Sequence, residues 1–211
     1  MHDFDAPKKF PLRLFIENPH REMNKLTTFF RIIMIIPIWL VLYWLSGKTC
    51  PFATYPWDVA MFGGFVVLPV IAMILFRQKY PRWWFDWNVE LTRFATRVSA
   101  YILLLRDEYP STDEEQAVHL EIDYPDVERK LNRWLPLVKW ILVIPHIIIL
   151  IFLSIAVLFC TIFAWFSILF TGRYPTEMFN FVVGVIRWGL RVEAYAILLV
   201  TDEYPPFSLD E

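Results

Sequence analysis

The chain has 211 residues, of which 57% are hydrophobic and 18% aromatic, and its formal net charge is −2. Ordinary soluble proteins contain about 45–50% apolar residues, so this composition favours a membrane protein over a soluble domain. The small net charge, with basic residues dispersed along the chain, argues against a nucleic-acid partner. We therefore expect a membrane protein that binds no nucleic acid.

A polar N-terminal tail at residues 1–11 precedes long apolar blocks, within which residues 32–45, 59–76 and 140–170 carry no Asp, Glu, Lys or Arg. Spans are expected near residues 29–45 and 59–76, and a third apolar block covers residues 135–170. About 20 mainly apolar residues cross a bilayer, and so short a chain lacks the amphipathic shell that would bury these blocks in a soluble domain. The blocks are therefore predicted to span a membrane.

The chain repeats itself at an offset of 94 positions. Tyr80-Pro81 returns as Tyr174-Pro175, and the arginines at 93 and 97 return at 187 and 191. Each half then closes on the motif Asp-Glu-Tyr-Pro, at 107–110 and at 202–205. We expect a first repeat at residues 12–110 and a second at 118–209, packed together as one unit.

The third block allows two topologies. Arg31 matches Lys139 and Pro37 matches Pro145 at an offset of 108, so the second copy is shorter where the first has a polar connection. This register predicts a tight helical hairpin and four spans in all. The alternative is one long helix, tilted or kinked at Pro145. We favour the hairpin because it keeps both charged motifs on one side of the membrane.

Basic residues set the expected orientation, because loops retained in the cytoplasm are enriched in Lys and Arg. They gather before the first span and in the central segment, whereas Lys48 is the only one in the loop 46–58. The N-terminus and the central segment are therefore predicted to be cytoplasmic.

The polar segments predict a small cytoplasmic β element and interfacial helices. Residues 12–17 and 118–124 alternate with the period of two that is typical of half-buried strands. Residues 98–105 and 192–200 could form further strands, or end amphipathic helices that begin near residues 83 and 178. We favour helices up to the second Arg of each pair and extended tails beyond it. The expected fold is an all-α membrane protein made of a duplicated transmembrane hairpin.

Two arginines in each copy stand four residues apart and so share a helical face. With tryptophans nearby, they suit contact with lipid phosphates or with acidic groups of a partner. The alternative, which we weigh more heavily, is intramolecular pairing that fixes the fold. The candidate lipid- or partner-binding residues are Arg93, Arg97, Arg173, Arg187, Trp188 and Arg191.

His146 lies inside the run 140–170, which has no Asp, Glu, Lys or Arg, and this makes it an intramembrane polar candidate. We prefer a structural role, with a neutral imidazole bonded to a carbonyl freed by Pro145, over a proton relay or a cofactor ligand. The other histidines lie in aqueous segments, so no metal site and no cofactor are expected.

Several short motifs of the second half carry a family resemblance: Val118–Pro125, Ile144-Pro145-His146, Thr171–Pro175 and Tyr204–Phe207. Together they resemble an uncharacterised family of bacterial membrane proteins, domain of unknown function 4389, with two tandem copies in this chain. The first copy departs from the pattern, since Ile38 replaces the histidine and Ser111 replaces the second proline. The resemblance implies a bacterial inner-membrane protein and no known activity.

No motif for nucleophilic, phosphate-binding or metal-dependent catalysis occurs, so we do not expect an enzyme. The expected function is that of an accessory or scaffolding subunit of a larger membrane complex. The alternative is a lipid-binding or small-solute transport component that acts as an oligomer. The expected partners are anionic lipid headgroups, other membrane subunits, or further copies of the chain.

Overall fold

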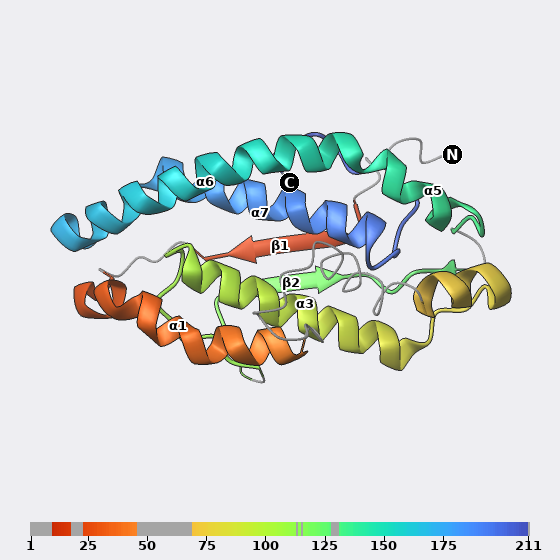
Figure 1. Cartoon of the computed structure of the whole chain (residues 1–211), viewed down its shortest axis with the longest axis horizontal. Coiled ribbons are helices and arrows are strands. Elements are labelled where there is room, and N and C mark those ends of the chain that lie inside the picture. Colours follow the sequence, from red (N-terminus) through yellow and green to blue (C-terminus); the bar gives the residue numbers. More distant parts are fainter. Residues whose placement is uncertain are drawn as a thin grey trace, which may run out of the picture.

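The computed structural model describes residues 10–17, 23–45, 69–112, 114, 116–127 and 131–210. Within these ranges the fold is mostly helical with one small sheet, as predicted, although residues 59–68 of the expected second span lie outside them. In chain order, the elements are β1 (Leu12–Ile16), α1 (Lys25–Leu45), a helical segment at 69–77, α3 (Arg82–Ile102), β2 (Val118–Ile122), α5 (Leu135–Leu142), α6 (Ile144–Thr171) and α7 (Thr176–Ala196) (Figure 1).

The predicted β element is confirmed as a two-stranded antiparallel sheet. β1 and β2 pair with Leu14 opposite Leu120, and both side chains are buried. β1 packs against α7 and β2 packs against α3, so each strand contacts the long helix of the other half of the chain (Figure 1). The sheet therefore joins the two halves at the centre of the molecule.

The offset of 94 relates α3 to α7. The two helices begin at Arg82 and Thr176 and end at Ile102 and Ala196. Proline precedes each of them, with φ −61° and ψ 128° at Pro81 and φ −62° and ψ 126° at Pro175. Proline fixes φ near −65° and has no N–H to satisfy, so it suits the start of a helix.

The extended tails predicted after Arg97 and Arg191 are wrong. Both helices continue for five more residues, to Ile102 and Ala196. Tyr101 and its counterpart Tyr195 are buried on the same helical face as the preceding apolar residues. The helical spacing of buried residues therefore continues beyond the second arginine of each pair. Left-handed residues follow each helix, Leu104 with φ 63° and Leu199 with φ 56°.

The hairpin predicted within residues 135–170 is also wrong. α6 runs without a turn from Ile144 to Thr171, and the break from α5 falls at Val143, just before Pro145. Because no turn-forming residue interrupts the block near Ser154, continuous helix formation prevails over the repeat register. Of the described helices, only α6 is long and apolar enough to span a membrane, so four spans are not supported.

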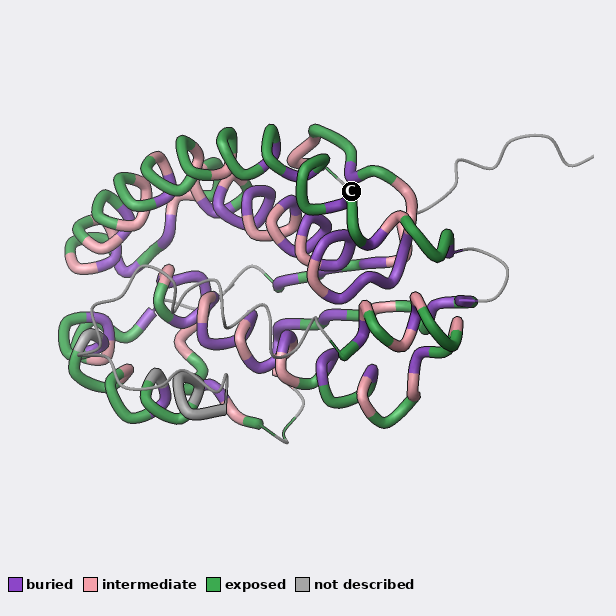
Figure 2. The backbone as a smooth tube through the Cα atoms, turned by 45° about the vertical axis from the view of Figure 1, so that its right-hand side comes forward, coloured by how far each residue is buried: buried purple, intermediate pink, exposed green. Residues whose placement is uncertain are grey.

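α6 is exposed although it is apolar. Only 11% of its most apolar 18-residue window is buried, whereas the core helix of a soluble protein is mostly buried. Figure 2 shows the contrast between the largely exposed α6 and the largely buried α7 beside it. The C-terminal part of α6 also meets α1, where the indole N–H of Trp165 donates to the carbonyl of Thr28 at 3.4 Å. Most of the remaining surface of α6 is therefore apolar and exposed.

Candidate functional site

Arg93 and Arg187 hold the centre of the sheet. Arg93 donates from Nη2 to the carbonyl oxygen of Leu120 at 3.1 Å, and it pairs with Glu90. Arg187 donates from Nη2 to the carbonyl oxygen of Leu14 at 3.3 Å. Leu14 and Leu120 are opposite each other in the sheet, so each arginine ties its helix to the strand of the other half.

Arg97 and Arg191 hold the segments that follow their helices. Arg97 donates to the carbonyl of Ser111 at 2.9 Å, and Arg191 donates to the carbonyls of Ser208, at 3.2 Å, and Asp210. Both arginines are buried. These contacts favour the intramolecular alternative, and a lipid or partner role for the arginine pairs stays a prediction.

The remaining two candidates, Arg173 and Trp188, differ in their exposure to solvent. Arg173 is exposed in the turn between α6 and α7. Trp188 is buried inside the protein, so its indole does not reach a lipid surface. The structure thus does not gather the six predicted residues into one binding surface.

A buried cation in the second half was missed by sequence reasoning. Lys139 is fully buried in α5, and its Nζ lies 2.8 Å from Oδ1 of Asp202 and 2.6 Å from the carbonyl oxygen of Thr201. The ammonium lies 4.8 Å from the ring centre of Tyr195, and Asp202 also accepts the backbone N–H of Asn132. Burial lowers the pKa of the Lys139 ammonium, which the hydrogen bond and the charge of Asp202 oppose.

The first half repeats this arrangement. Arg31 is buried in α1, pairs with the carboxylate of Asp107, and lies 4.5 Å from the ring centre of Tyr101. Asp107 also accepts the backbone N–H of Asn24 at 2.8 Å. We call the two arrangements the clamps, Arg31–Asp107 and Lys139–Asp202.

The clamps explain the repeated Asp-Glu-Tyr-Pro motif. Asp107 neutralises the buried Arg31, and Asp202 neutralises the buried Lys139. The signal was present in the match of Arg31 to Lys139, which places a cation at the same point of both apolar blocks. A buried cation requires a counter-ion, and the repeated aspartates were available.

His146 sits in a closed aromatic cluster. Its imidazole is fully buried, and its Nδ1 accepts the indole N–H of Trp188 at 3.0 Å. The ring of Phe207 stacks on it at 4.0 Å with an interplanar angle of 9°, and the ring centre of Tyr204 lies 4.8 Å away. The predicted bond to a carbonyl freed by Pro145 is wrong, since the partner of His146 is Trp188.

The residues of this cluster are those of the short motifs in the second half: the histidine of Ile-Pro-His, Trp188, and the aromatic rings of Tyr-Pro-Pro-Phe. Residues 134–208 match a family model described as "Domain of unknown function (DUF4389)". The matched segment holds α5, α6, α7 and the tail, and therefore the second clamp and the His146 cluster. Tandem occurrence in this chain stays a prediction. No curated protein and no solved structure matches the chain.

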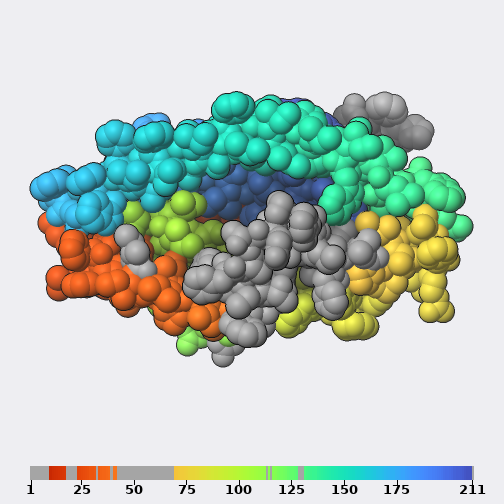
Figure 3. Space-filling model, viewed as in Figure 1, coloured from red at the N-terminus to blue at the C-terminus, as the bar shows by residue number. Residues whose placement is uncertain are grey.

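Within the DUF4389 segment, α6 presents an aromatic surface. Spacings of 7, 4, 3 and 4 residues place five phenylalanines within about 60° on one side of the helix. Their exposed fractions run from 48% to 80%, and α6 forms one edge of the molecule in Figure 3. We call this surface the phenylalanine stripe: Phe152, Phe159, Phe163, Phe166 and Phe170.

The buried side of α6 lies roughly opposite the stripe. His146, Val157, Ala164 and Ile168 are its buried residues, and their spacing places them about 120–160° around the helix from Phe152. α7 is the main neighbour of α6 among the described elements. The stripe is therefore an outer surface of the folded chain, available to another molecule.

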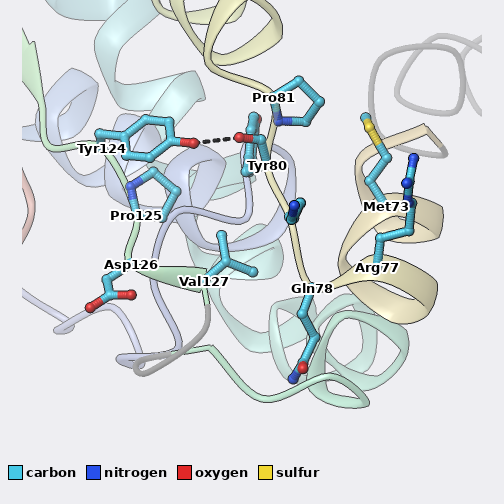
Figure 4. A pocket seen from close by; sticks show the side chains of 10 residues that line it. Met73, Arg77, Gln78, Tyr80, Pro81, Tyr124, Pro125, Asp126 and Val127 are labelled. Atoms are coloured by element: carbon cyan, nitrogen blue, oxygen red, sulfur yellow. Dashed lines mark hydrogen bonds between the residues drawn. The ribbon is translucent and has the colours of Figure 1, made fainter.

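Outside this segment, a pocket of about 610 Å³ lies between the helical segment at 69–77 and the chain that follows β2 (Figure 4). Arg77 and Asp126 line it from its two sides, and the hydroxyl of Tyr124 donates to the carbonyl of Tyr80 across it. Its mixed charges select no class of ligand. Within the described ranges, no cluster of His, Cys, Asp and Glu side chains could hold a metal ion.

Glu193 on α7 makes the stability of the fold depend on pH. Burial raises the pKa of its carboxyl from 4.5 to about 7, and a hydrogen bond with Thr92 opposes the shift. The folded state then binds the proton more tightly than the unfolded state. The contribution of the Glu193 carboxyl to the free energy of unfolding is therefore fully present below pH 4.5 and is lost as the pH rises through about 7.

We therefore expect Glu193→Gln to leave stability unchanged near pH 4.5 and to raise it by on the order of 1–2 kcal/mol at pH 8, because the amide carries no charge to bury. Thermal unfolding in detergent at both pH values measures the difference. Glu177→Gln is the matched control, since Glu177 is an exposed glutamate on the same helix. An equal effect of Glu193→Gln at both pH values would contradict the assignment.

Proposed function

We propose that this protein is a non-catalytic integral membrane protein that serves as an accessory or scaffolding subunit of a larger membrane complex. The phenylalanine stripe on α6 carries the proposal, because it is an ordered aromatic surface on the outside of an apolar helix. The distribution of Lys and Arg supports a cytoplasmic N-terminus. We propose a bacterial inner membrane as the location, because the resemblance carried by the motifs of the second half implies it.

The stripe suits another protein better than it suits lipid alone. Lipid requires only that a surface be apolar and sets no spacing for its side chains. Residues that recur every seven positions, with others between them, match the packing of one helix against another. Aromatic side chains also contribute strongly to protein interfaces. The partner is therefore a membrane helix whose small residues leave grooves that the phenyl rings can fill.

The charged residues support a role without catalysis. Arg93, Arg97, Arg187 and Arg191 donate to carbonyls of the chain itself. The two clamps satisfy the buried cations, and the stacked rings enclose His146. These contacts support a role of the groups in holding the fold, and we propose that the apolar exterior is the surface that acts on other molecules.

The proposal is tested by replacing Phe159, Phe163 and Phe166 together with alanine. The tagged protein is extracted from its native membrane in mild detergent, and copurifying proteins and lipids are quantified by mass spectrometry. We expect at least a tenfold loss of a stoichiometric partner protein, with the yield of the variant in the membrane unchanged. The control replaces Ile147, Ile151 and Leu158, which are exposed on a different side of α6, and should retain the partner.

Other outcomes decide between the remaining functions. A partner that copurifies equally with the stripe variant and the control contradicts the role of the stripe. Recovery of a lone oligomer with a defined lipid favours the alternative of a lipid-binding or transport component. One observation supports that alternative: an apolar pocket of about 450 Å³ between α1 and α6, lined by Ile35, Ile162 and Trp165 among others.

A further inference from the structure

A third pocket lies in the first half of the chain, far in the sequence from the stripe. Its volume is about 540 Å³, and it is open to one side and lined by residues of α1, of α3 and of the chain from Tyr109 to Glu114. Ile38 and Phe94, which are 7% and 4% exposed, form apolar walls. Pockets of roughly 300–1,000 Å³ are the usual size for bound ligands. We call it the first-half pocket.

The second half shows what fills the equivalent place. Ile38, Phe94 and Tyr109 correspond to His146, Trp188 and Tyr204, at offsets of 108, 94 and 95 positions. The ring of Phe207 contacts all three of the second set, at centroid distances of 4.0, 5.8 and 6.0 Å. The counterparts of all its ring neighbours therefore line the first-half pocket.

The two places differ at several positions of the sequence, and the largest loss of ring volume is at Thr112. At the offset of 95, Thr112 stands where the second half has Phe207, and Thr112 lines the pocket. A threonine side chain is too small to fill the space that a phenyl ring fills. The sequence thus keeps the aromatic and apolar surroundings of the ring in the first half and omits the ring itself.

We propose that the first-half pocket binds an aromatic side chain presented by a partner polypeptide, in the way that Phe207 occupies the equivalent place. Ile38 and Phe94 supply the apolar contact, and the ring of Tyr109 supplies an aromatic edge. In the second half, the ring is carried by a Tyr-Pro-Pro-Phe segment, whose prolines hold an extended backbone at low entropic cost. The partner segment has the same chemistry.

The rim of the pocket adds a preference for charge. Ser111, Thr112 and Glu114 line this side of the pocket, and the Oγ of Ser111 accepts the backbone N–H of Glu114 at 3.3 Å. Hydroxyl groups can bond to the backbone of an extended peptide, and the carboxylate favours a basic residue beside the aromatic one. The site is therefore selective for an aromatic residue next to Lys or Arg. It is separate from the phenylalanine stripe, and its test does not depend on the proposed function.

The experiment uses the full chain in lipid nanodiscs and a fluorescein-labelled peptide, Lys-Tyr-Pro-Pro-Phe-Lys amide. We expect saturable binding by fluorescence anisotropy with one peptide per chain, and none to empty nanodiscs. Thr112→Phe fills the pocket from within the chain and should weaken binding at least tenfold. Thr112→Val keeps the shape of threonine and should bind as the wild type does. A peptide with Ala in place of both Tyr and Phe should also bind at least tenfold more weakly.

A second variant keeps the test decisive if Thr112→Phe does not fold. Phe207→Ala opens the equivalent place in the second half, so the stoichiometry should rise from one peptide to two per chain. Absence of saturable binding, equal binding of the two peptides, or unchanged binding to folded Thr112→Phe would overturn the proposal. Equal binding of the two peptides would show that charge alone attracts the probe to the rim.

Discussion

Asp202→Asn is expected to lower the free energy of unfolding by about 3–5 kcal/mol, because it leaves the charge of Lys139 without its counter-ion. Lys139 is fully buried, and its described polar contacts are with Asp202 and the carbonyl of Thr201. The asparagine keeps the shape of the carboxylate, so the change tests charge rather than packing. Chemical denaturation in detergent, followed by tryptophan fluorescence, measures the loss.

Two further variants control this result. Glu121→Gln removes one partner of the exposed pair Arg13–Glu121, whose atoms lie 3.9 Å apart, and should cost less than about 0.5 kcal/mol. Lys139→Met combined with Asp202→Leu removes both charges and should recover most of the stability. A cost below about 1 kcal/mol for Asp202→Asn would show that the clamp contributes little to the fold.

The His146–Trp188 pair should behave as a unit in a double-mutant cycle. The first half has Ile38 and Phe94 at the equivalent positions, so it supplies the replacement residues. His146→Ile leaves the indole N–H of Trp188 without its acceptor, and Trp188→Phe leaves Nδ1 of His146 without its donor. We expect about 2–3 kcal/mol for each single change, because an unsatisfied buried polar group is costly.

The double variant should cost about as much as either single variant, which corresponds to a coupling of about 2 kcal/mol. Chemical denaturation of the wild type, both single variants and the double variant gives this coupling. Ile147→Val changes an exposed neighbour on the same helix and should cost less than about 0.5 kcal/mol. Strictly additive costs would contradict the hydrogen bond between His146 and Trp188.

The clamp variants and the His146–Trp188 cycle also test what the motifs of the segment that matches the family model contribute to the fold. The Asp-Glu-Tyr-Pro motif contributes a counter-ion and an aromatic ring, and the Ile-Pro-His motif contributes an imidazole that Trp188 and Phe207 enclose. Both motifs thus fix the chain after α7 against the start of the apolar block. The polar residues that these motifs place in apolar surroundings thus make contacts that hold the fold together.

Local patterns in the sequence determined the elements of the fold. Alternation at residues 12–16 and 118–122 predicted the two strands, because successive side chains in a strand point to opposite faces. The offset of 94 predicted that the two amphipathic helices correspond to each other. The uncharged block predicted α6, although repeat register was a poor guide to its topology, since it says nothing of whether a turn can form.

Only the tertiary structure decided which polar groups meet. Lys139 and Asp202 lie 63 positions apart, and His146 and Trp188 lie 42 apart, so no helical or strand period relates them. The sequence showed that these residues were present and that the cation and the aspartate were repeated, but a buried cation or imidazole finds its partner only when particular faces of distant helices pack together. The periods of 3.6 and 2 describe single elements, and the pairing between elements depends on how the whole chain packs.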